Sequence, residues 1–175
     1  WIVDTRITER DWGGLDRTTE EERFEKFGEV IAMREVEPFF WMPPDGESMN
    51  DVLLRARDFI DSLHRSNTAN IIAVCHGEVA KILRMIFFGY TPMEYAEMEF
   101  SKDPAQRIMN CQIDCYTRRN PETLECSDRI EWFRYYRPYH GGASDWIHLP
   151  RRRFSSHDLM REANKLSDKF KDLDL

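Results

Sequence analysis

The chain of 175 residues is long enough for one domain with a hydrophobic core. Its 41% apolar and 13% aromatic content excludes a disordered or fibrous protein, and a net charge of −7 argues against a nucleic-acid-binding surface. No apolar run approaches the roughly 18 residues that would span a bilayer, so we expect no membrane segment.

The N-terminal third predicts a strand end, a helix and a loop. Trp1–Ile7 is typical of the end of a strand that leads into a polar turn. Thr19 and Glu22 have the spacing of a capping box, which predicts a helix from there to about Arg34. Three prolines within Glu37–Asp45 predict a loop, because proline interrupts both helices and strands.

The middle of the chain carries the clearest α/β pattern. Ser48 predicts a helix start, and apolar residues continue at helical spacing to Leu63. The short apolar run Asn70–Cys75 is typical of a strand buried on both faces of a parallel sheet. A helix over Val79–Phe88 follows and should end at the next residue, a glycine.

The C-terminal third predicts two strands and a helix. Apolar and polar residues alternate over Met109–Tyr116, and Arg129–Arg137 indicates a further strand, antiparallel and near an edge. Ser155 and Asp158 predict the cap of a final amphipathic helix. We therefore expect an α/β fold in a single domain over residues 1–175: an open, mostly parallel sheet with helices on both faces and an antiparallel edge.

Two polar positions follow predicted strands, where open α/β sheets place their sites. His76 can donate to a phosphoryl oxygen or act as a nucleophile, and Gly77 lets an anion approach the start of the next helix. The alternative is that His76 only caps this helix. Glu9 could act as a general acid at the same rim and Arg10 could bind a phosphate or carboxylate, although such a pair in a polar turn is often only solvated surface.

Three motifs in order are more specific than any one of them. The segments Thr8–Asp16, Pro44–Ser48 and Val74–Glu78 closely resemble the histidine phosphatase superfamily, in the branch that contains cofactor-dependent phosphoglycerate mutase and its phosphatase relatives. The resemblance runs from Trp1 to about Tyr116, whereas the extension from about residue 119 has no counterpart. It implies a phosphoglycerate mutase-like fold and a phosphomonoesterase that acts through a phosphohistidine on a phosphorylated small molecule.

The resemblance also implies residue roles. Glu9 would protonate the leaving group and later activate water, and His76 would stabilise the transferring phosphoryl group, with Gly77 close to it. Arg10 and Trp12 would contact substrate. No metal or cofactor is expected, because histidine and arginine supply the positive charge. The alternatives are a mutase-type phosphotransferase and a non-catalytic binding or scaffold domain.

One element of the family pattern is missing from the sequence. The family's nucleophilic histidine lies in an Arg-His-Gly motif, which does not occur in the 175 residues. The segment at Trp1 resembles one that follows this motif, so we expect an N-terminally truncated chain that is inactive alone. We also expect the aromatic run from Phe39 to Met42 to form an apolar wall of the substrate pocket.

The four cysteines favour none of the rival chemistries. A cysteine phosphatase needs an arginine six positions after its nucleophile, and no cysteine here has one. Cys111, Cys115, Cys126 and His140 could ligate zinc, but they lack close Cys-x-x-Cys pairs. Because four cysteines are too few for a disulfide scaffold in a chain of this size, they favour a reduced, cytoplasmic protein.

Overall fold

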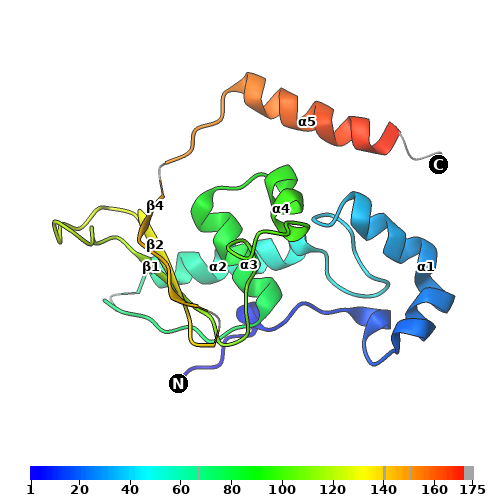
Figure 1. Ribbon diagram of the computed structural model, residues 1–175, viewed down its shortest axis with the longest axis horizontal. Coiled ribbons are helices and arrows are strands. Elements are labelled where there is room, and N and C mark those ends of the chain that lie inside the picture. The colour runs from blue at the N-terminus through cyan, green and yellow to red at the C-terminus, as the bar shows by residue number, and fades with distance from the viewer. Residues whose placement is uncertain (67, 140, 150, 172–175) are drawn as a thin grey trace.

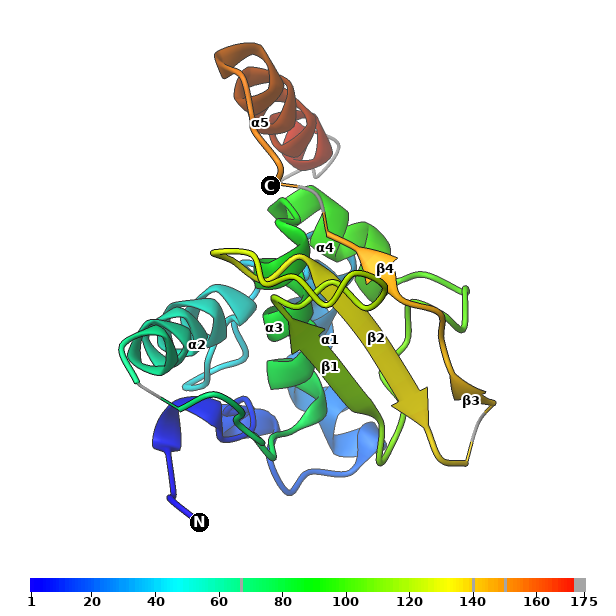
Figure 2. The same ribbon diagram turned by 90° about the vertical axis from the view of Figure 1, so that its left-hand side faces the viewer.

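The computed structural model describes residues 1–66, 68–139, 141–149 and 151–171. Five helices and a four-stranded sheet make up this part of the chain (Figures 1 and 2). The helices are α1 (Glu20–Val36), α2 (Met49–His64), α3 (Gly77–Phe88), α4 (Pro92–Glu99) and α5 (Ser156–Lys171). The strands are β1 (Ile113–Thr117), β2 (Trp132–Arg137), β3 (Gly142–Ala143) and β4 (Ile147–His148), and 3₁₀ turns lie at Thr5–Ile7 and Gly13–Leu15.

The predicted helix starts are confirmed in atomic detail. Thr19 Oγ1 accepts the Glu22 N–H at 3.2 Å, and the Glu22 carboxylate accepts the Thr19 N–H at 2.9 Å, so both ends of the capping box are made. Ser48 caps α2 in the same way. The predicted end of α3 is confirmed too, because Gly89 takes up a left-handed conformation with φ of 68°. Helix α4, which was not predicted, begins with a third capping box, at Thr91.

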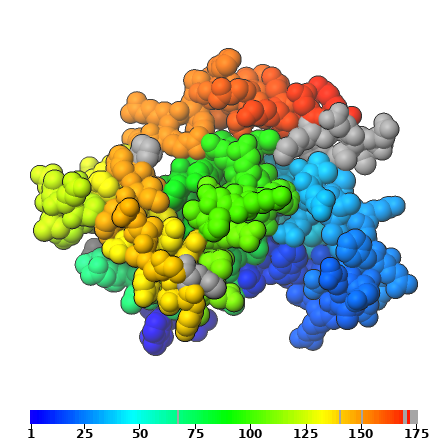
Figure 3. Space-filling model, in the orientation of Figure 1, coloured from blue at the N-terminus to red at the C-terminus, as the bar shows by residue number. Residues whose placement is uncertain are grey.

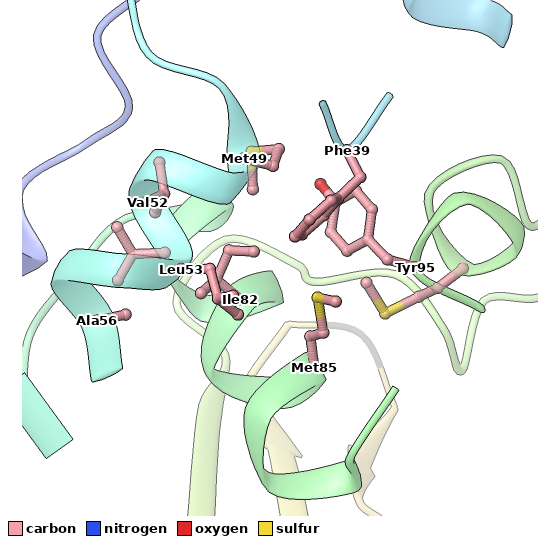
Figure 4. Close-up of a cluster of buried hydrophobic side chains, with 10 residues drawn as sticks. Phe39, Met49, Val52, Leu53, Ala56, Ile82, Met85 and Tyr95 are labelled. Atoms are coloured by element: carbon pink, nitrogen blue, oxygen red, sulfur yellow. The ribbon is translucent and has the colours of Figure 1, made fainter. Parts of the chain in front are cut away.

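The hydrophobic core lies between α2 and α3. Figure 4 shows the apolar face of α2 meeting Ile82 and Met85 of α3, and the rings of Phe39 and Tyr95 closing the cluster, 5.5 Å apart. The members are buried almost completely, and each large aliphatic side chain contributes about 1.5–3 kcal/mol to the free energy of unfolding. The cluster comprises Phe39, Met49, Val52, Leu53, Ala56, Val79, Ile82, Met85, Tyr95 and Met98.

The sheet packs on the other side of α3. Strands β1, β3 and β4 all pair with β2, and every pairing is antiparallel. Aromatic contacts join the sheet to the last turn of α3: Phe87 lies 4.4 Å from Tyr116, and Phe88 lies 5.1 Å from Phe133. Helix α3 is thus enclosed by α2 and by the sheet.

The expected open, mostly parallel sheet is not confirmed. The run Asn70–Cys75 pairs with no strand in the described part of the chain, and its Ile72 and Val74 are 81% and 73% exposed. The expected strand end at Trp1–Ile7 is irregular before its 3₁₀ turn. Helices do not cover both sheet faces either, because Ile113 and Cys115 on β1 are exposed. A strand forms only where a second backbone accepts its hydrogen bonds, and apolar composition does not provide that backbone.

The C-terminal extension contributes β2, β3 and β4 as well as α5. Figure 3 shows the orange and red segment lying along the green region that contains α4. Its contacts include a hydrogen bond from the Thr91 hydroxyl to Glu162 at 2.9 Å and an ion pair of Arg152 with Glu94 at 2.6 Å. All four cysteines are free, three of them exposed.

None of the helices, within the described residues, has the length and apolar character needed to cross a membrane.

Candidate functional site

The two residues expected at one rim, Glu9 and His76, lie next to each other. Glu9 Oε2 and His76 Nδ1 are 3.9 Å apart, although the residues are distant in the sequence. The side chains are 38% and 58% exposed. This separation is longer than a hydrogen bond, so each polar head remains available to a ligand while both can reach the same small group.

The backbone around Glu9 is fixed by an arginine from α2. The Arg55 guanidinium donates to the carbonyl oxygens of Arg6 (2.8 Å), Thr8 (2.9 Å) and Glu9 (3.3 Å). The Glu9 side chain is oriented in addition by the Arg10 N–H, which donates to its Oε1 at 2.9 Å. One carboxylate oxygen of Glu9 is therefore held, and the other faces His76.

The same arginine connects the loop that carries Glu9 to a second loop, which contains Gly46 and Glu47. Arg55 also forms two parallel hydrogen bonds of 2.9 Å to the carboxylate of Glu47. Glu47 in turn exchanges hydrogen bonds with Asp11, whose N–H donates to the carboxylate at 3.0 Å and whose carbonyl accepts the Glu47 N–H at 2.9 Å. At Gly46 a Cβ would lie 2.6 Å from the Asp11 carbonyl oxygen, so only glycine lets the two loops approach this closely.

The sequence did not predict a role for Arg55. The only signal was its position on the helix that opens after the 46–48 motif. Most of its partners are main-chain carbonyls, and no residue pattern encodes which carbonyls will face a side chain.

His76 occupies the N-cap position of α3 but does not cap the helix with its side chain, so the alternative reading of this residue is not supported. Its carbonyl begins the helix by accepting the Ala80 N–H at 2.9 Å. A Cβ on Gly77 would meet nothing within 4 Å, so the space before the first turn is open. The N–H groups of a first helical turn have no partner inside the helix and favour an anion.

Arg10, expected to contact substrate, lies inside the protein. It is 3% exposed, and its guanidinium donates to the carbonyls of Glu47 (2.7 Å) and Trp41 (3.1 Å). The guanidinium also stacks on the rings of Trp12 and Trp41, at 4.7 and 5.2 Å. Burial lowers the pKa of Arg10 below its usual value. These contacts hold the loop that carries Glu9 from its buried side. Trp12 was also expected to contact substrate, but it is half-buried and belongs to this stack.

Charges on the first turns of α3 are paired with each other. Lys81 Nζ lies 3.0 Å from the Glu78 carboxylate and 2.7 Å from that of Glu99, which also pairs with Arg34 at 2.8 Å. Burial lowers the pKa of Lys81, but the two carboxylates outweigh it and leave this pKa raised. Lys81 and Arg34 are therefore both committed to carboxylates.

The aromatic run Phe39–Met42 does not form a continuous wall. Phe39 is 2% exposed within the core and Trp41 is 7% exposed, whereas Phe40 and Met42 point outward. Alternate residues of the loop thus face opposite sides. No cluster of candidate metal ligands occurs among the described residues, and His140 of the zinc alternative lies outside them.

The family model described as histidine phosphatase superfamily (branch 1) matches residues 1–113, which include Glu9 and His76. The 6-phosphofructo-2-kinase/fructose-2,6-bisphosphatase 3 of Homo sapiens is 28% identical over 103 residues, covering 59% of this chain and 19% of that protein. The 6-phosphofructo-2-kinase/fructose-2,6-bisphosphatase of Gallus gallus is 31% identical over 81 residues, covering 46% and 17%.

This chain therefore spans about a fifth of the length of these curated relatives. Among solved structures, Mycobacterial hydrolase 1 aligns with a TM-score of 0.48 and 22% identity, covering 54% of this chain and 50% of that one.

Proposed function

Because the chain belongs to the histidine phosphatase superfamily, we propose that it forms the acid and phosphoryl-stabilising part of a phosphomonoesterase that works through a phosphohistidine. The observation that carries this proposal is the 3.9 Å approach of the Glu9 carboxylate to the His76 imidazole at the open N-terminus of α3. A proton donor and a phosphoryl-binding group must both reach the phosphorus centre, and this pair lies close enough to do so.

In the first proposed step, a histidine attacks the phosphorus atom in line with the leaving group. The new P–N bond forms as the P–O bond to the leaving group breaks, and Glu9 donates its proton to the departing oxygen. His76 and the first N–H groups of α3 donate hydrogen bonds to the equatorial oxygens and stabilise their charge. The nucleophile would be the histidine of the family's Arg-His-Gly motif, which the 175 residues do not contain.

In the second step, Glu9 as carboxylate takes a proton from water. The oxygen of that water attacks phosphorus, the P–N bond breaks with its electron pair returning to the histidine, and inorganic phosphate leaves. Glu9 thereby regains the proton that it lost in the first step. Arg55 and Arg10 act only as positioning residues in this scheme, because their described hydrogen bonds hold the Glu9 and Glu47 loops.

For the substrate we propose a phosphorylated small molecule. The printed names of the curated relatives include a fructose-2,6-bisphosphatase, which makes fructose 2,6-bisphosphate the first natural compound to assay beside generic phosphomonoesters.

The decisive experiment measures hydrolysis of a chromogenic phosphomonoester in the presence of EDTA. The full-length gene product is assayed beside its His76→Ala variant and a matched control, His64→Ala, which removes an exposed histidine at the end of α2. We expect turnover to fall about 100-fold or more in H76A, the magnitude for loss of one oxyanion-stabilising donor, and to be unchanged in H64A. Equal activity of the two variants would refute the role of His76.

The role of Glu9 has its own test, a series of leaving groups assayed with Glu9→Gln. A general acid matters most when the departing oxygen is strongly basic. E9Q should therefore lose much more activity on an alkyl phosphate than on a nitrophenyl phosphate. A loss that is the same for both leaving groups would show that Glu9 does not donate the proton.

Two alternative functions remain as outcomes of these assays. Transfer of the phosphoryl group to a second hydroxyl in preference to water would identify a mutase-type phosphotransferase. No turnover by a folded full-length protein would identify a non-catalytic binding domain. Turnover by the isolated 175-residue chain would contradict a nucleophile from the Arg-His-Gly motif.

A further inference from the structure

A second candidate site lies at the opposite end of α3 from Glu9 and His76. The helix has 12 residues, so its ends are about 18 Å apart. Beside its C-terminal end is a pocket of about 330 Å³, lined by the ends of α2 and α3, by residues just before β2 and by the segment that leads to α5. This volume falls at the lower end of the range of about 300–1,000 Å³ for small-molecule sites.

The floor of the pocket is apolar. Ile60 of α2 and Leu149 are 8% and 4% exposed, and Phe88 of α3 is fixed by its edge-to-face contact with Phe133. Phe154, on the segment before α5, completes one side and is 39% exposed. Such a lining favours a hydrocarbon group over a polar one, because an apolar wall offers no hydrogen bonds to replace those of water.

The rim, in contrast, is basic. Every ionisable side chain that lines the pocket belongs to a histidine or an arginine: His64, Arg129, Arg151 and Arg152. None of the described residues that line it is acidic, although acidic residues outnumber Lys and Arg by 32 to 25 in the chain as a whole. The described side chains that line the pocket are therefore richer in basic groups than the chain as a whole.

Two of these four side chains are still available to a ligand. Arg129 and Arg152 are paired with Glu131 and Glu94 at 2.8 and 2.6 Å. Arg151 is exposed, as is His64, and in the described residues neither side chain has a hydrogen bond or an ion pair. An anionic group at the mouth would therefore meet Arg151 without displacing an existing carboxylate.

Two residues that line the outer side of the pocket, Leu149 and Arg152, are held in place without a ligand. The Leu149 N–H donates to the Glu131 carbonyl at 2.7 Å, which attaches one end of the wall beside β2. At the other end, Arg152 donates to the Gly89 carbonyl at 3.1 Å and pairs with Glu94. Because Leu149 and Arg152 are already held, these two residues lose little conformational entropy on binding, which favours affinity.

From this geometry we propose that the pocket binds a single-chain anionic amphiphile, such as a medium-chain fatty acid carboxylate. The hydrocarbon chain lies on the apolar floor between α2 and α3, and the carboxylate accepts hydrogen bonds from Arg151. The charge complementarity of the rim selects an anion, and the floor selects a hydrocarbon chain. This proposal is independent of phosphatase activity, because the pocket and the Glu9–His76 pair lie at opposite ends of α3.

The test is a binding titration with the 175-residue chain, using the fluorescence of dansyl-undecanoate and its displacement by decanoate. Arg151→Glu should weaken binding about tenfold or more, because it replaces a charge-assisted hydrogen bond with repulsion. Arg153→Glu is the matched control: it makes the same charge change two residues away, at a position that does not line this pocket. Far-UV circular dichroism and thermal unfolding confirm that both variants fold.

Each outcome decides for or against the proposal. Saturable binding that R151E weakens and R153E preserves supports it, as does displacement by decanoate at concentrations about tenfold lower than those needed for decanol. The absence of saturable binding, or equal affinity of R151E and R153E, overturns it. Displacement by decanol and decanoate at equal concentrations would show that the anionic head group does not contribute to binding. Binding only to anionic phospholipid vesicles would show that the protein binds a membrane surface and not a single amphiphile in the pocket.

Discussion

Replacing Arg55 by alanine tests whether one side chain holds the loop that carries Glu9. The guanidinium makes five hydrogen bonds, three to main-chain carbonyls and two to the Glu47 carboxylate. The side chains of Arg55 and Glu47 are only 17% and 28% exposed, so water replaces these contacts incompletely in the variant. Arg55→Ala should therefore lose a substantial part of the free energy of unfolding.

The size of the loss follows from the geometry. Removing one partner of a buried ion pair costs about 3–5 kcal/mol, and a hydrogen bond to a charged group contributes about 1.5–3 kcal/mol, but contributions from one side chain do not add. Because Glu47 is partly exposed and water can reach it, we expect a loss of about 2–4 kcal/mol. Arg55→Lys keeps the charge but not the planar guanidinium. Its free energy of unfolding should therefore lie between those of Arg55→Ala and the wild type.

Urea denaturation followed by circular dichroism measures this loss. The matched control is Arg57→Ala, at an exposed position on the same helix, which should change stability by less than about 0.5 kcal/mol. A double-mutant cycle that combines Glu47→Ala with Arg55→Ala should show a large coupling energy, because the two side chains share two hydrogen bonds. The reasoning is refuted if R55A and R57A unfold at the same urea concentration, or if the E47A and R55A effects simply add.

Two further predictions concern loop packing and pH. Gly46→Ala should lower the urea concentration at the unfolding midpoint, because a Cβ there would lie 2.6 Å from the Asp11 carbonyl oxygen. Gly28 lies in open space within α1, so Gly28→Ala should instead raise the free energy of unfolding by about 0.5–1 kcal/mol. Urea denaturation of both variants checks these opposite signs. A hydrogen bond from Arg6 lowers the pKa of Asp4 from 3.8 to about 2, so its contribution to stability is present above pH 3.8 and lost as the pH falls through 2. Thermal unfolding of wild type and Asp4→Asn should thus differ at pH 5 and converge toward pH 2, and a difference that persists at pH 2 would contradict this pKa.

The local features of this protein could be read from neighbouring residues. Thr19 with Glu22, and Ser48, predicted helix starts that the structure contains, because a helix cap involves only residues about three positions apart. Gly89 predicted the end of α3 for the same local reason, since glycine adopts positive φ without steric cost.

The relation between Glu9 and His76 was also predictable, but from the order of three motifs and not from any local rule. Each residue follows a segment that was expected to be a strand, and neither segment pairs as a strand in the described part of the chain. The structure nevertheless brings the two side chains to 3.9 Å. The expectation for the pair therefore came from the resemblance, while the strand argument for it did not hold.

Only the tertiary structure decided which backbones meet and which way the arginines point. The apolar run Asn70–Cys75 was expected to be buried in a parallel sheet, whereas the observed strands pair antiparallel around β2 and leave Ile72 exposed. Arg10 and Arg55 turn toward main-chain carbonyls of loops distant in the sequence. Every residue carries the same carbonyl group, so the identity of the side chains cannot specify such partners, and only the packing of α2 against the two loops selects them.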